Sequence, residues 1–178
     1  MRFPIAIAGL LLFAGCFEKP LLEITTSMQY NAYNSILFLT ESANVALLED
    51  SSELAKYITA EELKTAFDSM DNEFNEPKRS RRFEYRFYGN RFTNDKFDAD
   101  LILFQDMAKH GRDYHFQLRT YTKKRELIDK LDFAVWDEEL RIHCEGKLTP
   151  ELKIVKSYTD SLSEYWQLGN NGRFAGLN

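Results

Sequence analysis

The sequence lacks most of the short motifs that mark a catalytic or metal-binding protein. It contains no His-Glu-x-x-His, Cys-x-x-Cys or His-x-x-x-His pattern, and its acidic clusters lack the glycine-containing loop of a calcium site. It also contains neither the Gly-x-Ser-x-Gly turn of serine hydrolases nor a glycine-rich phosphate loop. These absences favour a non-catalytic protein without a metal or cofactor, although they leave the question of catalysis open.

The sequence also lacks an apolar run long enough to stay in a membrane as a helix. The apolar stretch near the start covers residues 3–17, whereas a membrane-spanning helix needs about 20 residues. Arg2 precedes this stretch, its centre is rich in leucine, and small residues follow before Cys16. This order is typical of a secretory signal peptide, so we expect residues 1–15 to be cleaved from the mature protein.

The residues around the expected cleavage point resemble a known family signature. Leu12-Phe13-Ala14-Gly15-Cys16 resembles the lipobox of bacterial lipoproteins. The resemblance implies that Cys16 carries acyl chains such as palmitate, which hold the protein on a membrane. It further implies an outer-membrane location in a Gram-negative host, because Phe17 stands where an Asp would retain the protein in the inner membrane.

Cysteine is scarce in the rest of the chain, where Cys144 is the one other example. If Cys16 is acylated, no disulfide can form within one chain, and we expect Cys144 to be a small buried side chain. The alternative is an ordinary cleaved signal peptide, after which Cys16 and Cys144 could form a disulfide. The mass of the mature protein distinguishes the two.

The chain has no excess of basic residues, since its formal net charge is −5. Nucleic-acid binding depends on a basic surface, so we expect no nucleic acid as a partner. One basic run nevertheless follows Pro77. It fits either a solvated connection between elements or a contact with phosphate-bearing lipid head groups. Its charged residues are Lys78, Arg79, Arg81 and Arg82.

The sequence contains no internal repeat, low-complexity segment or Pro- or Ser-rich linker, which favours one folded domain. We assign residues 16–26 to the lipid anchor and tether, residues 27–169 to a single domain, and residues 170–178 to a flexible tail. Helical spacing predicts a long helix over about 27–48, a short helix after Ser51, and a helix from Thr59 towards Phe74. Thr59 and Glu62 fit a capping box at the start of the last of these helices.

Alternation of apolar and polar residues predicts strands in the middle of the chain. The expected strands begin at Phe83 and cover about 100–105, 113–122, 131–136 and 140–145. Thr149, Pro150 and the apolar spacing that follows predict a closing helix that ends before Gly169. The expected fold is therefore α+β, with N-terminal helices packed on a curved antiparallel sheet and a C-terminal helix. By analogy of element order alone, this layout is similar to cystatin-like and NTF2-like folds.

Aromatic residues are plentiful on the expected strands, where they fit ordinary core packing or a concave cleft for an apolar ligand or peptide. The cleft residues would be Phe83, Tyr85, Phe87, Tyr114 and Phe116. His115 and His143 could share a sheet face and, with Glu145, bind zinc or copper. Their spacing is not diagnostic, so we expect solvated histidines and no metal site.

These observations lead to a function by elimination. We expect a lipid-anchored protein of the bacterial envelope that acts as a non-catalytic binding or assembly module on an envelope protein or ligand. The alternative is a periplasm-facing small-ligand carrier or hydrolase, with its site in the concave face of the sheet.

Overall fold

The computed structural model describes residues 19–25, 46–48, 51–66, 83–106 and 113–177, and all structural statements below concern these residues. They form ten strands and two short helices. The elements are β1 (Leu22–Ile24), β2 (Ala46–Leu47), α3 (Ser51–Leu54), α4 (Ala60–Ala66), β3 (Phe83–Thr93), β4 (Phe97–Asp106), β5 (Asp113–Thr122), β6 (Leu127–Asp137), β7 (Ile142–Leu148), β8 (Lys153–Tyr158), β9 (Ser163–Leu168) and β10 (Phe174–Leu177).

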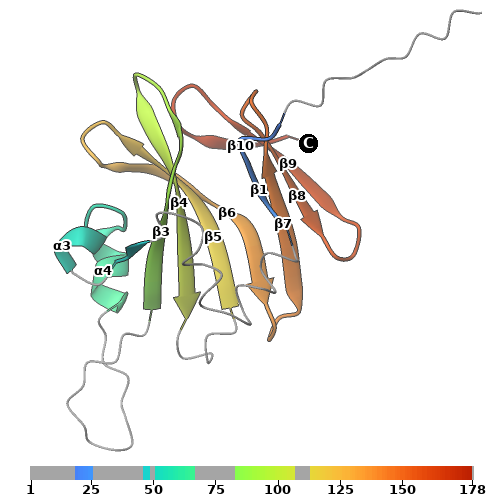
Figure 1. The fold of residues 1–178 in the computed structure, drawn as a ribbon, viewed down its shortest axis with the longest axis horizontal. Helices are drawn as coiled ribbons and strands as arrows, with labels where there is room; N and C mark the ends of the chain where they lie inside the picture. The colour runs from blue at the N-terminus through green and yellow to red at the C-terminus, as the bar shows by residue number, and fades with distance from the viewer. Residues whose placement is uncertain (1–18, 26–45, 49–50, 67–82, 107–112, 178) are drawn as a thin grey trace, which may run out of the picture.

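The ten strands belong to one antiparallel sheet. Strands β2 to β10 lie side by side in sequence order, so that each pairs with the next along the chain. The exception is β1, which pairs with β7 and lies beside it in Figure 1. The helices α3 and α4 come between β2 and β3. The predicted α+β fold with a C-terminal helix is therefore wrong, and the described chain is mostly antiparallel sheet.

The predicted closing helix is replaced by the hairpin of β8 and β9. The spacing of Ile154, Tyr158 and Leu162 fits a helix, but Ile154 and Lys156 are both buried and alternate along a strand. Leu152 and Ser161 adopt positive φ angles of 62° and 69°, which let the chain turn tightly at both ends of β8. β-Branched and aromatic residues between these turns favour the extended backbone.

Other predicted elements agree with the structure to different degrees. The five strands expected between residues 83 and 145 are confirmed as β3 to β7, and the bounds of β5 match those predicted. The helix predicted from Thr59 is confirmed as α4 up to Ala66, and its continuation towards Phe74 lies outside the described residues. Most of the predicted 27–48 helix also lies outside them, but its described end, Ala46–Leu47, forms the strand β2, so the helix prediction is wrong there. The strand β10 forms within the expected flexible tail.

The larger of two hydrophobic clusters, here the first core cluster, lies between the two halves of the curled sheet. The curl is closed where the β9–β10 turn reaches β5 and β6. There the Thr120 hydroxyl donates a hydrogen bond of 2.6 Å to the Gly172 carbonyl, and the Phe174 N–H donates one of 3.0 Å to Asp129 Oδ2. The cluster includes Phe97, Leu101, Leu103, Tyr114, Phe116, Leu118, Phe133, Trp136, Leu148, Ile154 and Leu168.

A second core cluster lies on the opposite face of β3 to β5, under the helices. Ile102 of β4 and Tyr85 of β3 pack there against Leu54 and Ile58. Both faces of β4 are therefore covered, which explains why this strand reads as a nearly continuous buried run. Figure 1 shows α3 and α4 beside β3 at one end of the sheet. In the described segments, neither helix is long and apolar enough to cross a membrane.

Gly146 of β7 lies directly against Phe133, at a bulge in β6, and the contact leaves no room for a side chain. The register of β5 with β6 shifts at Phe133, and β7 crosses its ring at Gly146. A Cβ atom on Gly146 would clash with the Phe133 carbonyl oxygen and lie 2.6 Å from the ring carbons.

We predict that Gly146→Ala lowers the free energy of unfolding by about 1–3 kcal/mol, because backbone must shift to admit the methyl group. Urea unfolding of the purified protein measures this. Gly176→Ala is the matched control, since its Cβ would meet nothing closer than Trp166 at 3.9 Å. Equal stability of the two variants would contradict the prediction.

Candidate functional site

The first turn of α4 is held by a reciprocal capping box, as the sequence predicts. The Thr59 N–H donates to Glu62 Oε2 at 2.9 Å, and the Glu62 N–H donates to Thr59 Oγ1 at 3.1 Å. These bonds satisfy two backbone donors that a helix start would otherwise leave open. They also fix the Glu62 carboxylate at the surface of the sheet.

Arg119 of β5 points towards this carboxylate and is 1% exposed. Its Nη1 and Nη2 donate to the two Glu62 oxygens at 3.0 Å each, which makes a bidentate ion pair. Nη1 also donates to the Tyr57 carbonyl at 3.0 Å, and Nε and Nη2 donate to Gln117 Oε1. All five guanidinium N–H groups therefore have an acceptor.

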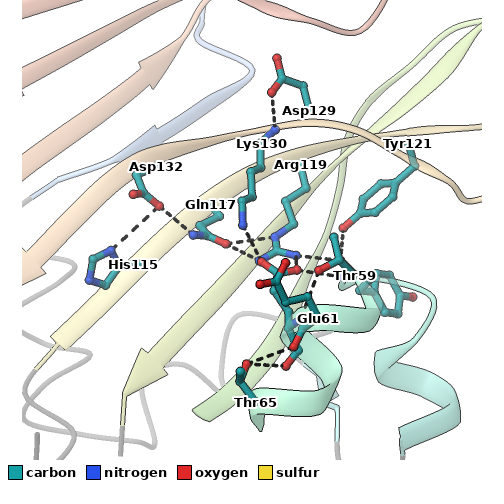
Figure 2. A network of polar contacts seen from close by, with 12 residues as sticks. Thr59, Glu61, Thr65, His115, Gln117, Arg119, Tyr121, Asp129, Lys130 and Asp132 are labelled. Carbon is teal, nitrogen blue, oxygen red and sulfur yellow. Dashed lines mark hydrogen bonds and ion pairs between the residues drawn. The ribbon is translucent and has the colours of Figure 1, made fainter.

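Further polar side chains extend the pair into the network drawn in Figure 2. Lys130 of β6 donates to Glu62 Oε1 at 2.6 Å, and the Tyr121 hydroxyl donates to the Tyr57 carbonyl at 2.6 Å. The Gln117 amide donates to Asp132 Oδ1 at 2.8 Å. The network joins α4 and the chain before it to β5 and β6, so it orients the helices on the sheet.

The charges in this network change the acidity of Glu62. Burial would raise the pKa of its carboxyl, but the Arg119 charge and hydrogen bonds from Lys130, the Thr59 N–H and Arg119 lower the pKa to about 2. Burial and the nearby Glu62 charge raise the pKa of Tyr85 to about 12. At neutral pH the site therefore holds a carboxylate and a neutral phenol.

Acidic residues at the other end of β4 are also paired with cations. Asp98 accepts a hydrogen bond from Lys123 at 2.7 Å, and Asp100 pairs with Arg125 at 2.8 Å. Hydrogen bonds from Lys123 and Thr93 hold the pKa of Asp98 below its ordinary value. Asp98 and Asp100 therefore serve as partners for the cations of the β5–β6 turn.

The structure divides the five aromatics of the expected cleft between two faces. Phe83, Tyr85 and Phe87 belong to the second core cluster under the helices, and Tyr114 and Phe116 belong to the first. They pack against other side chains on opposite sides of the sheet and do not line one concavity.

The two sheet histidines also lie on opposite faces. His143 stacks on Trp136 with ring centroids 3.9 Å apart, and Trp136 belongs to the first core cluster. His115 lies on the Arg119 face, where its Nδ1 is 3.9 Å from Asp132 Oδ1. Instead of His143, the structure brings the buried Asp113 and Asp137 close to His115.

Several expected site residues lie outside the described part of the chain, namely Cys16, Lys78, Arg79, Arg81 and Arg82. Cys144 lies inside it and is buried as predicted. Burial raises the pKa of its thiol.

Sequence reasoning missed Arg119 and its partners as a unit. The available signal was the alternation along β5, which places Gln117, Arg119 and Tyr121 on one face at a spacing of two residues. Together with the Thr59–Glu62 capping box, this polar face could have suggested that Arg119 pairs with the Glu62 carboxylate. The pairing itself spans 57 residues, which local patterns do not encode.

No protein-family model, curated protein or solved structure matches the chain.

We predict that Glu62→Gln removes a pH-dependent part of the stability. The folded pKa lies below the ordinary 4.5, so the carboxylate stabilises the fold fully above pH 4.5 and loses that effect as the pH falls towards 2. The shift corresponds to about 3 kcal/mol. Urea unfolding between pH 7 and pH 2 should show this difference from wild type at pH 7 and little at pH 2.

Glu61→Gln is the matched control, because Glu61 is the preceding residue and is exposed. Its unfolding profile should follow that of the wild type. A pH-independent difference between Glu62→Gln and wild type would contradict the ion-pair interpretation.

Proposed function

We propose that the mature protein is a lipid-anchored, non-catalytic binding module of the bacterial envelope that binds a protein partner at the β10 edge of its sheet. The observation that carries this proposal is the exposed edge of β10 from Ala175 to Leu177, together with apolar side chains exposed beside it. Cys16 would supply the membrane attachment, in the outer membrane if the host is Gram-negative.

The β10 edge offers backbone groups to a partner strand. Among the described residues, β10 pairs with β9 alone, and from Ala175 to Leu177 its residues are exposed. Leu177 lies opposite Tyr165 in the register, and these side chains are 46% and 54% exposed. Leu162, in the preceding turn, is 64% exposed. An open edge beside exposed apolar groups is the surface that strand addition uses.

The alternative role of a ligand carrier or hydrolase finds less support in the geometry. The aromatics expected to line its concave site are packed in two separate clusters. A surface cavity of about 150 Å³ lies over β1, β7 and β8, below the roughly 300 Å³ at which typical ligand pockets begin. Its polar lining includes Glu23, Lys147 and Ser157.

The position of β1 keeps the domain close to the proposed anchor. Five residues separate Cys16 from Leu22, so an extended chain would allow at most about 20 Å between them. Two or three acyl chains on Cys16 would give durable attachment, because each buried methylene contributes about 0.8 kcal/mol. A partner of the β10 edge would therefore meet the domain near the membrane surface.

We predict that cells given a labelled fatty acid incorporate the label into the wild-type protein and not into Cys16→Ala. The acyl chains have no other attachment point in the lipobox interpretation. Gel electrophoresis of the immunopurified protein measures the label. An unlabelled wild-type protein would contradict membrane anchoring through Cys16.

We predict that a photoreactive residue at Leu177 crosslinks in intact cells to one protein of defined mass, while the same residue at Leu140 does not. Leu140 is a matched control, since it is 62% exposed but lies in the β6–β7 turn. Adding Tyr165→Lys should abolish the crosslink, because it places a charge beside Leu177 among the exposed apolar side chains that the partner would cover. Equal crosslinking from both sites, or turnover of an envelope substrate by the purified protein, would refute the proposal.

A further inference from the structure

Asp113, His115 and Asp137 form a compact group at the end of the β5–β6 pair. Asp113 lies directly opposite Asp137 in the register, and His115 is two residues further along β5 on the same face. One ligand atom from each residue can be chosen so that all lie within 4.8 Å of one another. Three different side chains thus converge on one small volume.

The two carboxylates of this group are withdrawn from water, because Asp113 and Asp137 are each 2% exposed. Carboxylates at buried positions are held by hydrogen bonds, by a charged partner or by a metal ion.

A carboxylate lies near one ring nitrogen of His115. Its Nδ1 is 3.9 Å from Asp132 Oδ1, and Figure 2 shows the second ring nitrogen on the far side of the ring from Asp132. Metal-ligating histidines generally use one nitrogen for the ion and direct the other to a carboxylate or carbonyl. Asp137 is also held in place, since its Oδ1 accepts a hydrogen bond from the Leu140 N–H at 2.8 Å.

We propose that Asp113, His115 and Asp137 bind a divalent transition-metal ion, with Zn²⁺ as the representative ion. One imidazole nitrogen and two carboxylate oxygens suit Zn²⁺, whereas Ca²⁺ and Mg²⁺ take oxygen ligands. Ligand atoms around tetrahedral zinc lie about 3.3 Å apart, given bonds of about 2.0 Å. The ion would brace β5 against β6, and this inference does not depend on the proposed function.

The experiment uses the full-length mature protein, purified in detergent and stripped of metal with a chelator. Zn²⁺ should bind with a stoichiometry of one per chain in equilibrium dialysis and should raise the midpoint of thermal unfolding. Co²⁺ in place of Zn²⁺ should give a visible absorption band that His115→Gln changes. A wild-type protein without Zn²⁺ binding, or with an unchanged unfolding midpoint, would overturn the proposal.

Single-residue variants distinguish the side chains that would bind the ion from the side chains beside them. His115→Gln and Asp137→Asn should weaken Zn²⁺ binding by more than the roughly 10- to 100-fold expected for Asp132→Asn, which removes an outer partner. His143→Gln should bind like the wild type, because His143 lies on the other face. Near-ultraviolet circular dichroism checks that each variant is folded. Wild-type affinity in both His115→Gln and Asp137→Asn would also overturn the proposal.

Discussion

The buried guanidinium of Arg119 constrains how the helical segment packs on the sheet. A charge that is 1% exposed must find hydrogen-bond acceptors within the protein, and removing one partner from such a pair costs about 3–5 kcal/mol. Gln117 supplies an acceptor from the same strand, while Glu62 and the Tyr57 carbonyl supply the others from the helical segment. The apolar contacts around Ile102 are non-directional and would tolerate sliding, whereas these hydrogen bonds would not.

This constraint explains why β5 has one apolar face and one polar face. Tyr114, Phe116 and Leu118 face the first core cluster, and the residues between them form the polar face that meets α4 and β6. A strand with polar groups on a covered face is stable only if those groups are paired. The helices cover part of that face, and Glu62 supplies the charge that makes the covering favourable.

Local patterns were sufficient to predict the elements whose cause is local. The Thr59–Glu62 capping box involves residues three apart, and the alternation in β3 to β7 is visible within each strand. The C-terminal hairpin was missed because Leu152 and Ser161 adopt positive φ without being glycine or asparagine, the residues that usually mark this conformation. Between them, the spacing of apolar residues fits a helix as well as a strand.

The candidate sites were missed for a different reason, since they depend on register. The pairing of Asp113 with Asp137 and of Gln117 with Asp132 holds because the bulge at Phe133 adds one residue to β6 between them. Shifting the register by one residue would send these carboxylates to the opposite face. Sequence alone indicates which residues are charged, but it does not state where a bulge falls.

Gln117 connects the Arg119 network to the proposed metal site. Its amide nitrogen donates to Asp132 and its amide oxygen accepts from Arg119, so a flip of the amide would lose both interactions. Asp132 in turn faces the imidazole of His115. An ion held by His115 would therefore lie at the end of a row of contacts that passes through Asp132 and Gln117 to Arg119 and α4. The packing of the helices and the occupancy of the site would then be linked through one face of β5.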